Sequence, residues 1–215
     1  RKAQDTAMEC VSIMCEEAEA HAILIRYGLA EVLPLVLTTI STFAPLPGKK
    51  RRKSFALEVI KSLIKGSEKV NLWLTIARSD DQSLLLKYLR GLASYLAKEV
   101  DDKSGVIDNG IAEDVAIILA TVPAEIFSQE LASVNILESN IPNLLVSLLG
   151  SEKPESLRVQ CVKALVALVN NSEIAKAMCT GDSVPSILKM LGSNTDSKLN
   201  LSHFIRLNLI LQGNY

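Results

Sequence analysis

Cysteine and histidine are the residues of this chain with the widest range of chemistry, because they can ligate metals and act as nucleophiles. The sequence contains four cysteines and two histidines, at Cys10, Cys15, Cys161, Cys179, His21 and His203. None of the cysteines forms a C-x-x-C pair, and the spacing does not match a zinc framework. A thiolate activated by His21 would need Cys10 or Cys15 beside it, and no catalytic motif surrounds them. We therefore expect reduced core thiols, with neither a metal nor a cofactor.

Acidic pairs are a second candidate for chemistry, here as general acids or bases. The pairs are Asp80-Asp81 and Asp101-Asp102, and the first precedes a predicted helix over residues 83–98. Carboxylates are favoured at the positive end of a helix, so these pairs indicate helix boundaries. The sequence also lacks G-x-S-x-G, a glycine-rich phosphate loop and H-E-x-x-H. We predict no catalytic residue and no enzyme activity in this segment.

A basic run has three interpretations. It follows Pro45-Leu46-Pro47-Gly48 and consists of Lys49, Lys50, Arg51, Arg52 and Lys53. Consecutive cations repel one another and belong in solvent, so a solvated loop is one interpretation. The run could also be a nuclear-localisation or acidic-partner patch. Thirdly, it precedes Ser54 in an R-R-x-S pattern that basophilic kinases recognise, and Ser54 is also the predicted N-cap of a helix over 55–65.

Composition points to packed helices as the elements that carry these residues. Hydrophobic residues make up 48 % of the 215 positions and aromatic residues only 4 %, so Leu, Ile, Val and Ala must fill the core. Glycine and proline are sparse, which disfavours β architectures with many turns. The formal net charge is −1, which disfavours nucleic-acid binding, and no apolar run is long enough for a membrane span. We expect a cytoplasmic protein, with a nuclear location as an alternative.

Internal repeats organise the sequence. The segment 145–151 (LVSLLGS) aligns with 187–193 (ILKMLGS) at an offset of 42, and the apolar spacing continues without a gap into 201–211. Independently, 10–37 aligns with 164–191 at an offset of 154. Apolar residues three and four positions apart give each copy one buried helical stripe.

The repeated pattern resembles the armadillo family. That family's repeat has a short helix, a glycine turn, an "I-P-x-L-V-x-L-L" helix and a long third helix. Matching features are Tyr27-Gly28, Asn109-Gly110, Gly181-Asp182, Ile141-Pro142 and Val184-Pro185. The resemblance implies an all-α, right-handed superhelical solenoid of about five repeats, some irregular, in one domain over 1–215. A generic helical bundle and the related HEAT repeats are the alternatives.

The repeat boundaries that we predict are approximate. An orphan third helix covers 1–17, and the repeats cover 18–66, 67–99, 100–131, 132–170 and 171–213. The repeat over 67–99 lacks a first helix, and the third helix of the repeat over 100–131 is shortened. Because a solenoid repeat buries its faces only against its neighbours, we expect the chain to be a fragment of a longer array, with further repeats of the same chain as partners.

The resemblance also implies where a partner binds, because third helices line the concave groove of armadillo proteins. In importin-α and β-catenin an asparagine of "A-L-x-N-L" holds the ligand backbone. The corresponding positions here are Ile13, Ser62, Tyr95, Ala167 and Leu209, and none is asparagine. One turn earlier, where importin-α has tryptophan, stand Glu9, Glu58, Gly91, Lys163 and Ile205. The family's extended-peptide grip is therefore absent, and nuclear-import carriage is not expected.

A partner-binding groove is still predicted, with different side chains. The residues expected to face it are Glu58, Ser62, Tyr88, Tyr95, Gln160 and Lys163. Tyrosine is a frequent interface anchor, although packing inside the fold is an equal alternative for both tyrosines. Glutamates at 16, 17, 19 and 31 are expected to form a solvated rim that could steer a basic partner.

We therefore predict a scaffold or adaptor that binds other proteins along this groove. The alternative is a regulatory or co-chaperone module attached to an enzyme or another domain of the full-length protein, with the basic run 49–53 as its localisation or acidic-partner patch. Fold alone does not choose between them.

Overall fold

Every element of the computed structural model is a helix over the residues that it describes, which are 2–39, 54–65, 71–81, 83–101, 110–127, 130–150 and 153–180. This confirms the predicted all-α class for that part of the chain. The first six helices are α1 (Lys2–Met14), α2 (Ala18–Arg26), α3 (Leu29–Thr39), α4 (Phe55–Ile64), α5 (Leu72–Ala77) and α6 (Leu84–Asp101). They are followed by α7 (Gly110–Ala120), α8 (Ala124–Phe127), α9 (Glu130–Glu138), α10 (Ile141–Ser147), α11 (Glu155–Leu168) and α12 (Ser172–Thr180).

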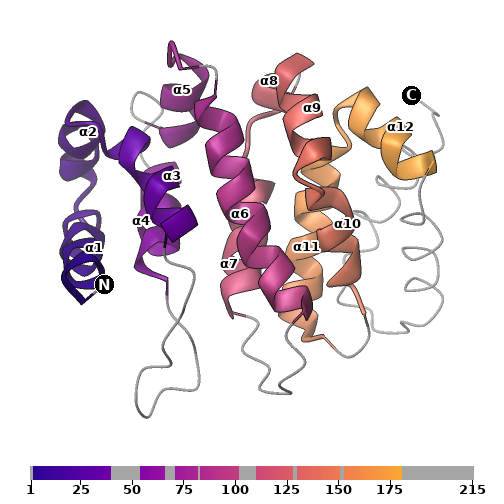
Figure 1. The fold of residues 1–215 in the computed structure, drawn as a ribbon, viewed down its shortest axis with the longest axis horizontal. Helices are drawn as coiled ribbons and strands as arrows, with labels where there is room; N and C mark the ends of the chain where they lie inside the picture. Colours follow the sequence, from indigo (N-terminus) through magenta and orange to yellow (C-terminus); the bar gives the residue numbers. More distant parts are fainter. Residues whose placement is uncertain are drawn as a thin grey trace.

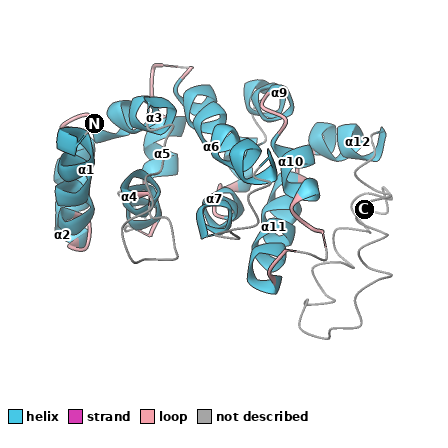
Figure 2. Cartoon of the chain, turned by 60° about the horizontal axis from the view of Figure 1, so that its bottom comes forward, coloured by secondary structure: helices cyan, strands magenta, loops and turns pink. Residues whose placement is uncertain are grey.

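The helices follow one another along the long axis in chain order (Figure 1). They pack in two layers, which are separated in Figure 2. In the first layer α1 contacts α4, α4 contacts α7, and α7 packs extensively against α11. In the second layer α3 contacts α6, and α6 contacts α10. Contacts between helices far apart in sequence therefore repeat along each layer.

Local sequence explains several helix boundaries. The Ser54 side chain accepts a hydrogen bond from the Leu57 backbone N–H at the start of α4, as predicted for an N-cap. Asp81 Oδ1 accepts from the backbone N–H and the hydroxyl of Ser83, at 2.9 and 2.6 Å, just before α6. This confirms that Asp81 marks a helix start. The Gly28 turn between α2 and α3 has φ +84°, which only glycine adopts without strain.

Buried aromatic residues link neighbouring helices. Trp73, Tyr88 and Tyr95 are completely or almost completely buried. The Tyr88 hydroxyl donates a 2.7 Å hydrogen bond to the Ala30 carbonyl, which links α6 to α3. Trp73 meets Tyr88 edge-on at 6.3 Å between ring centroids and donates from Nε1 to the Thr121 hydroxyl at 3.3 Å.

One of the predicted repeat boundaries falls inside a helix. The predicted boundary between residues 99 and 100 lies inside α6, which ends at Asp101. Helices α6 and α7 pack against each other. Each then continues a different layer, since α6 joins α3 and α10 while α7 joins α4 and α11. The contacts therefore link α6 and α7 to helices on either side of them in two different layers. Beyond α12, the second and third helices predicted over 184–213 lie outside the described residues.

Within the described part of the chain, no single helix is long and apolar enough to cross a membrane. Helices α2 and α3 taken together have the length and apolar composition of a membrane span, but they are bent by 87° relative to each other.

Candidate partner-binding face

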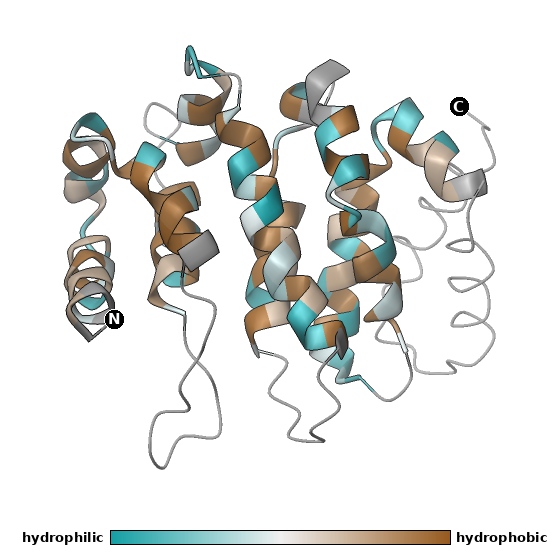
Figure 3. Ribbon diagram, in the orientation of Figure 1, coloured by the Kyte–Doolittle hydropathy of each residue, from teal (hydrophilic) through white to brown (hydrophobic). Residues whose placement is uncertain are grey.

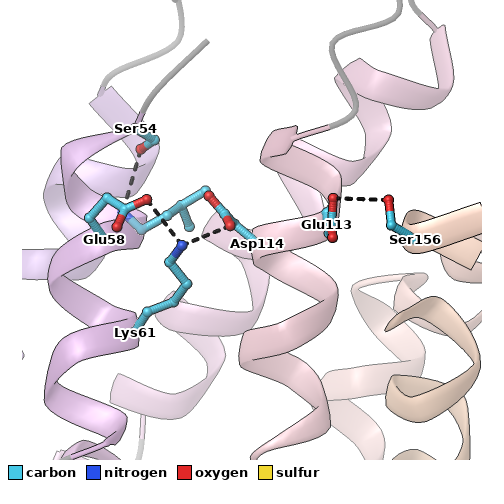
Figure 4. A network of polar contacts seen from close by, with 7 residues as sticks. Ser54, Glu58, Lys61, Glu113, Asp114 and Ser156 are labelled. Carbon is cyan, nitrogen blue, oxygen red and sulfur yellow. Dashed lines mark hydrogen bonds and ion pairs between the residues drawn. The ribbon is translucent and has the colours of Figure 1, made fainter. Parts of the chain in front are cut away.

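The outward side of the first layer carries polar side chains from three successive helices. We call it the α4–α7–α11 face, and its members are Glu58, Lys61, Ser62, Glu113, Asp114, Ser156, Gln160 and Lys163. Figure 4 shows the part of it where α4, α7 and α11 approach one another. A ligand lying across these helices would meet polar groups on each of them.

An ion triad joins α4 to α7. Lys61 Nζ lies 3.0 Å from Glu58 Oε1 on its own helix and 2.8 Å from Asp114 Oδ1 on the next (Figure 4). The side chain of Asp114 is only 10 % exposed and that of Lys61 19 %, so water screens their attraction less than at an open surface. Burial disfavours the charged lysine, but the hydrogen bonds and charges of Asp114 and Glu58 outweigh it and raise the pKa of Lys61.

A weaker contact joins α7 to α11. The Ser156 hydroxyl lies 3.4 Å from Glu113 Oε2, which is long for a hydrogen bond between oxygens. Glu113 is half-buried and Ser156 exposed. Because the contact is weak and close to solvent, the Glu113 carboxylate can exchange it for another donor.

Four of the six predicted groove residues lie on this face. Glu58 and Ser62 come from α4, and Gln160 and Lys163 come from α11. Lys163 is exposed and the other three are half-buried. The structure therefore places all four on helices of one layer, with α7 between them.

The two tyrosines are placed elsewhere, which corrects the expectation that they face a groove. Tyr88 is fully buried and Tyr95 is 1 % exposed. Both belong to α6, which lies in the second layer between α3 and α10 and also packs against α7. Its aromatic side chains therefore fill the core. Burial raises the pKa of Tyr95, and a hydrogen bond with the Ser54 hydroxyl acts in the opposite direction. The packing alternative for these residues is the correct one.

Sequence reasoning missed the α7 contribution to the face. Glu113 and Asp114 are adjacent carboxylates inside a helix that is otherwise almost entirely apolar. A buried carboxylate in such a helix needs a cationic or hydrogen-bonding partner. That requirement was a usable signal, and Lys61 is the partner that the fold supplies.

Ser54 is less accessible than a kinase site requires. Ser54 is only 4 % exposed, and its hydroxyl caps the start of α4. Phosphorylation of Ser54 would therefore require the start of α4 to open. The basic run Lys49, Lys50, Arg51, Arg52 and Lys53 lies outside the described residues.

His21 makes a structural contact with the backbone at Cys15 rather than with a thiol. His21 Nε2 contacts the Cys15 backbone carbonyl at 2.8 Å, and this contact fixes α2 against the end of α1. Cys15 and Cys161 are buried, as predicted for core thiols, and burial raises their pKa values to about 11 and about 12, with a smaller contribution at Cys161 from the Glu113 charge. Cys10 is exposed, so the core expectation is wrong for that cysteine. Among the described residues no group of three or more His, Cys, Asp or Glu could hold a metal ion.

Comparison with known proteins does not assign the chain to a family. No family model matches the sequence, and no curated protein matches it. One solved structure, an engineered protein from the Northeast Structural Genomics Consortium, is similar over 99 % of this chain and 92 % of its own, at 19 % identity and a TM-score of 0.49. A similarity at that level carries no argument about function.

Proposed function

We propose that the chain is a segment of an armadillo-type solenoid that binds other proteins through the α4–α7–α11 face. In this proposal α2–α3–α4, α5–α6–α7 and α9–α10–α11 are successive repeats. Helix α1 is the third helix of the repeat before them, and α12 is the first helix of the repeat after them. The sequence offsets of 42 and 154 and the two continuous layers support this assignment.

The observation that carries the functional proposal is the polar character of one layer's outward side. In the first layer α4, α7 and α11 present carboxylate, amide, hydroxyl and ammonium groups that are only partly buried. Mixed polar groups of this kind provide directional hydrogen bonds to a peptide or loop, which is how a surface fixes the register of a ligand.

Two parts of the face have different roles in this proposal. The Lys61–Asp114 pair is shielded and holds α4 and α7 at a fixed spacing. The groups that contact a partner are the side chains outside the Lys61 ion triad, which are the half-buried Ser62 and Gln160 and the exposed Lys163. The first role concerns stability and the second concerns affinity, so substitutions separate them.

Affinity capture from a cell lysate tests the proposal with a matched control. The face variant changes Ser62, Gln160 and Lys163 to Ala, none of which belongs to the Lys61 ion triad. The control variant changes Lys87 and Arg90 to Ala, because these are exposed charged residues on α6 in the other layer. We expect the face variant to lose proteins that the wild type and the control both retain. Equal capture by all three chains would contradict the proposal.

A further inference from the structure

One arginine of the molecule is buried as an unpaired cation. Arg158 lies in the first turn of α11 and is only 7 % exposed. Among the described residues, its buried Nε and Nη1 atoms have no hydrogen-bond partner, and no carboxylate forms an ion pair with it. A buried charge is strongly disfavoured unless it is paired. The position of Arg158 therefore favours the approach of an anion.

The surroundings of Arg158 on its own helix are apolar. One and two turns further along the same side of α11 lie Cys161, Val162 and Leu165, all at most 2 % exposed. Hydrophobic colour covers much of α7, against which α11 packs extensively (Figure 3). Because water screens a cation little in such surroundings, the guanidinium group interacts strongly with a charge that reaches it.

The N-terminus of α11 adds further donors beside Arg158. The residue before the helix is Pro154, which makes no side-chain capping hydrogen bond. The Arg158 backbone N–H donates to the Pro154 carbonyl at 3.1 Å and closes the first turn, so the N–H groups of residues 155–157 point out of the helix end. Long side chains in a helix lean towards its N-terminus. The Arg158 side chain therefore extends to the end where the helix dipole also favours negative charge.

We propose that Arg158 and the N-terminus of α11 form a binding site for an oxyanion, which is a carboxylate or phosphate group of a ligand. The planar guanidinium group offers several donors to such a group, and charge-assisted hydrogen bonds are the strong ones. The exposure that Arg158 retains lets an ion approach from solvent. Lys153 before the helix adds positive charge, whereas Glu155 in its first turn and Glu113 on α7 oppose it. These carboxylates limit a single oxyanion to an affinity in the millimolar range.

The oxyanion site is separate from the α4–α7–α11 face. Residues advance by about 100° each around a helix, so Arg158 lies roughly opposite Ser156 and Lys163. Those two residues are exposed and belong to the face, whereas Arg158 is on the buried side of the helix. Either proposal can therefore fail without the other.

Thermal unfolding of the 215-residue chain tests the site, with phosphate and acetate as the probes and chloride at matched ionic strength as the reference. We expect phosphate, acetate or both, at about 10 mM, to raise the unfolding midpoint by at least 2 °C over chloride, because a ligand that binds only the folded chain stabilises it. An effect of phosphate alone would assign the site to phosphate groups, and an effect of acetate would assign it to carboxylates. Equal midpoints in all three salts would overturn the proposal.

Variants then locate the effect. Arg158→Met removes the charge and should abolish the anion-dependent shift. Arg158→Lys keeps the charge but loses the planar donor group, so it should retain less than half of the shift. The control is Arg90→Met, which changes an exposed arginine on α6 and should retain all of it. If Arg158→Met gains as much from phosphate as the wild type does, phosphate acts through its general exclusion from protein surfaces, and the proposal is wrong.

A measurement on the wild type covers the case in which Arg158→Met does not fold. Hydrogen–nitrogen correlation NMR records the Arg158 Nε–H group, whose signal is identified by its loss in Arg158→Lys. We expect this signal to shift progressively as phosphate or acetate is added and to stay in place with chloride. A signal that responds to none of these anions, or equally to all three, would overturn the proposal.

Discussion

Lys61 Nζ lies 2.8 Å from Asp114 Oδ1, although the two residues are 53 positions apart in sequence. The contact joins α4 to α7 in the first layer. The contact is largely shielded, and Glu58 shares the same ammonium group. It places a charge network between α4 and α7 at the centre of the face that we propose for partner binding (Figure 4).

Replacing Lys61 by Met should destabilise the fold. The substitution leaves the Asp114 carboxylate in a poorly hydrated position without its cation, and we expect a loss of about 1–3 kcal/mol in the free energy of unfolding. Urea denaturation measures it. The double variant Lys61→Met with Asp114→Leu should recover most of that loss, and a double variant as unstable as the sum of its single changes would argue against coupling.

The same pair predicts a dependence on alkaline pH. The folded pKa of Lys61 is raised above its unfolded value, so its stabilising contribution is fully present below the unfolded pKa and is lost as pH rises through the folded pKa. The stability difference between wild type and Lys61→Met should therefore be constant around neutrality and shrink only in strongly alkaline solution. Denaturation midpoints measured in parallel across pH would show this, whereas a difference that shrinks below pH 8 would contradict it.

Gly91→Ala should destabilise the packing of α3 against α6. A Cβ on Gly91 would lie 2.8 Å from the Leu37 Cβ, which is closer than real contacts allow. We expect a loss of about 1–3 kcal/mol from overpacking, although alanine is intrinsically the better helix former by up to about 1 kcal/mol. Thermal and urea unfolding both measure it, and a stabilised variant would show that the two helices are not in close contact there.

Tyr88→Phe should have a modest cost. The change removes the 2.7 Å hydrogen bond to the Ala30 carbonyl but keeps the ring against Trp73. We expect about 1 kcal/mol, because the buried carbonyl loses its donor. Tyr88→Ala should cost about 3–5 kcal/mol, since it also leaves a cavity. Similar costs for both variants would mean that the ring is not packed in the core.

Thiol reactivity should differ between cysteines. Cys10 is exposed, whereas burial raises the pKa of Cys15 to about 11 and that of Cys161 to about 12. Because the thiolate is the reactive form, iodoacetamide at neutral pH should label Cys10 first. Peptide mapping after brief labelling resolves the sites, and prompt labelling of Cys161 in the folded protein would contradict its burial. Uniform labelling in urea is the control.

The sequence predicted features that depend on local chemistry. The Ser54 N-cap and the Asp81 helix start involve residues within three positions of each other, so their geometry follows from the local pattern. The layer that each helix joins is not local information. Both α6 and α7 contain enough apolar residues to be buried, and only tertiary packing places α6 with α3 and α10. The tyrosines of α6 were therefore assigned to a surface that α7 occupies.

Some of that packing information was present in the sequence but weak. Gly91 within a long helix marks a close approach of another helix, here that of Leu37. The adjacent Glu113 and Asp114 within an apolar helix require a partner that could come from several lysines or arginines. Single-sequence patterns do not choose among such partners, because the choice depends on which helices stack.

Site-specific photo-crosslinking tests most directly whether partners bind across α4, α7 and α11. A photoreactive phenylalanine analogue is placed singly at Ser62, Glu113 or Gln160, one on each helix, and at Lys87 on α6 as the control. Irradiation in lysate, followed by mass spectrometry, identifies what is attached. The account predicts that the three face positions capture the same protein and that position 87 does not. Capture of that protein only from position 87, or equally from all four positions, would contradict it.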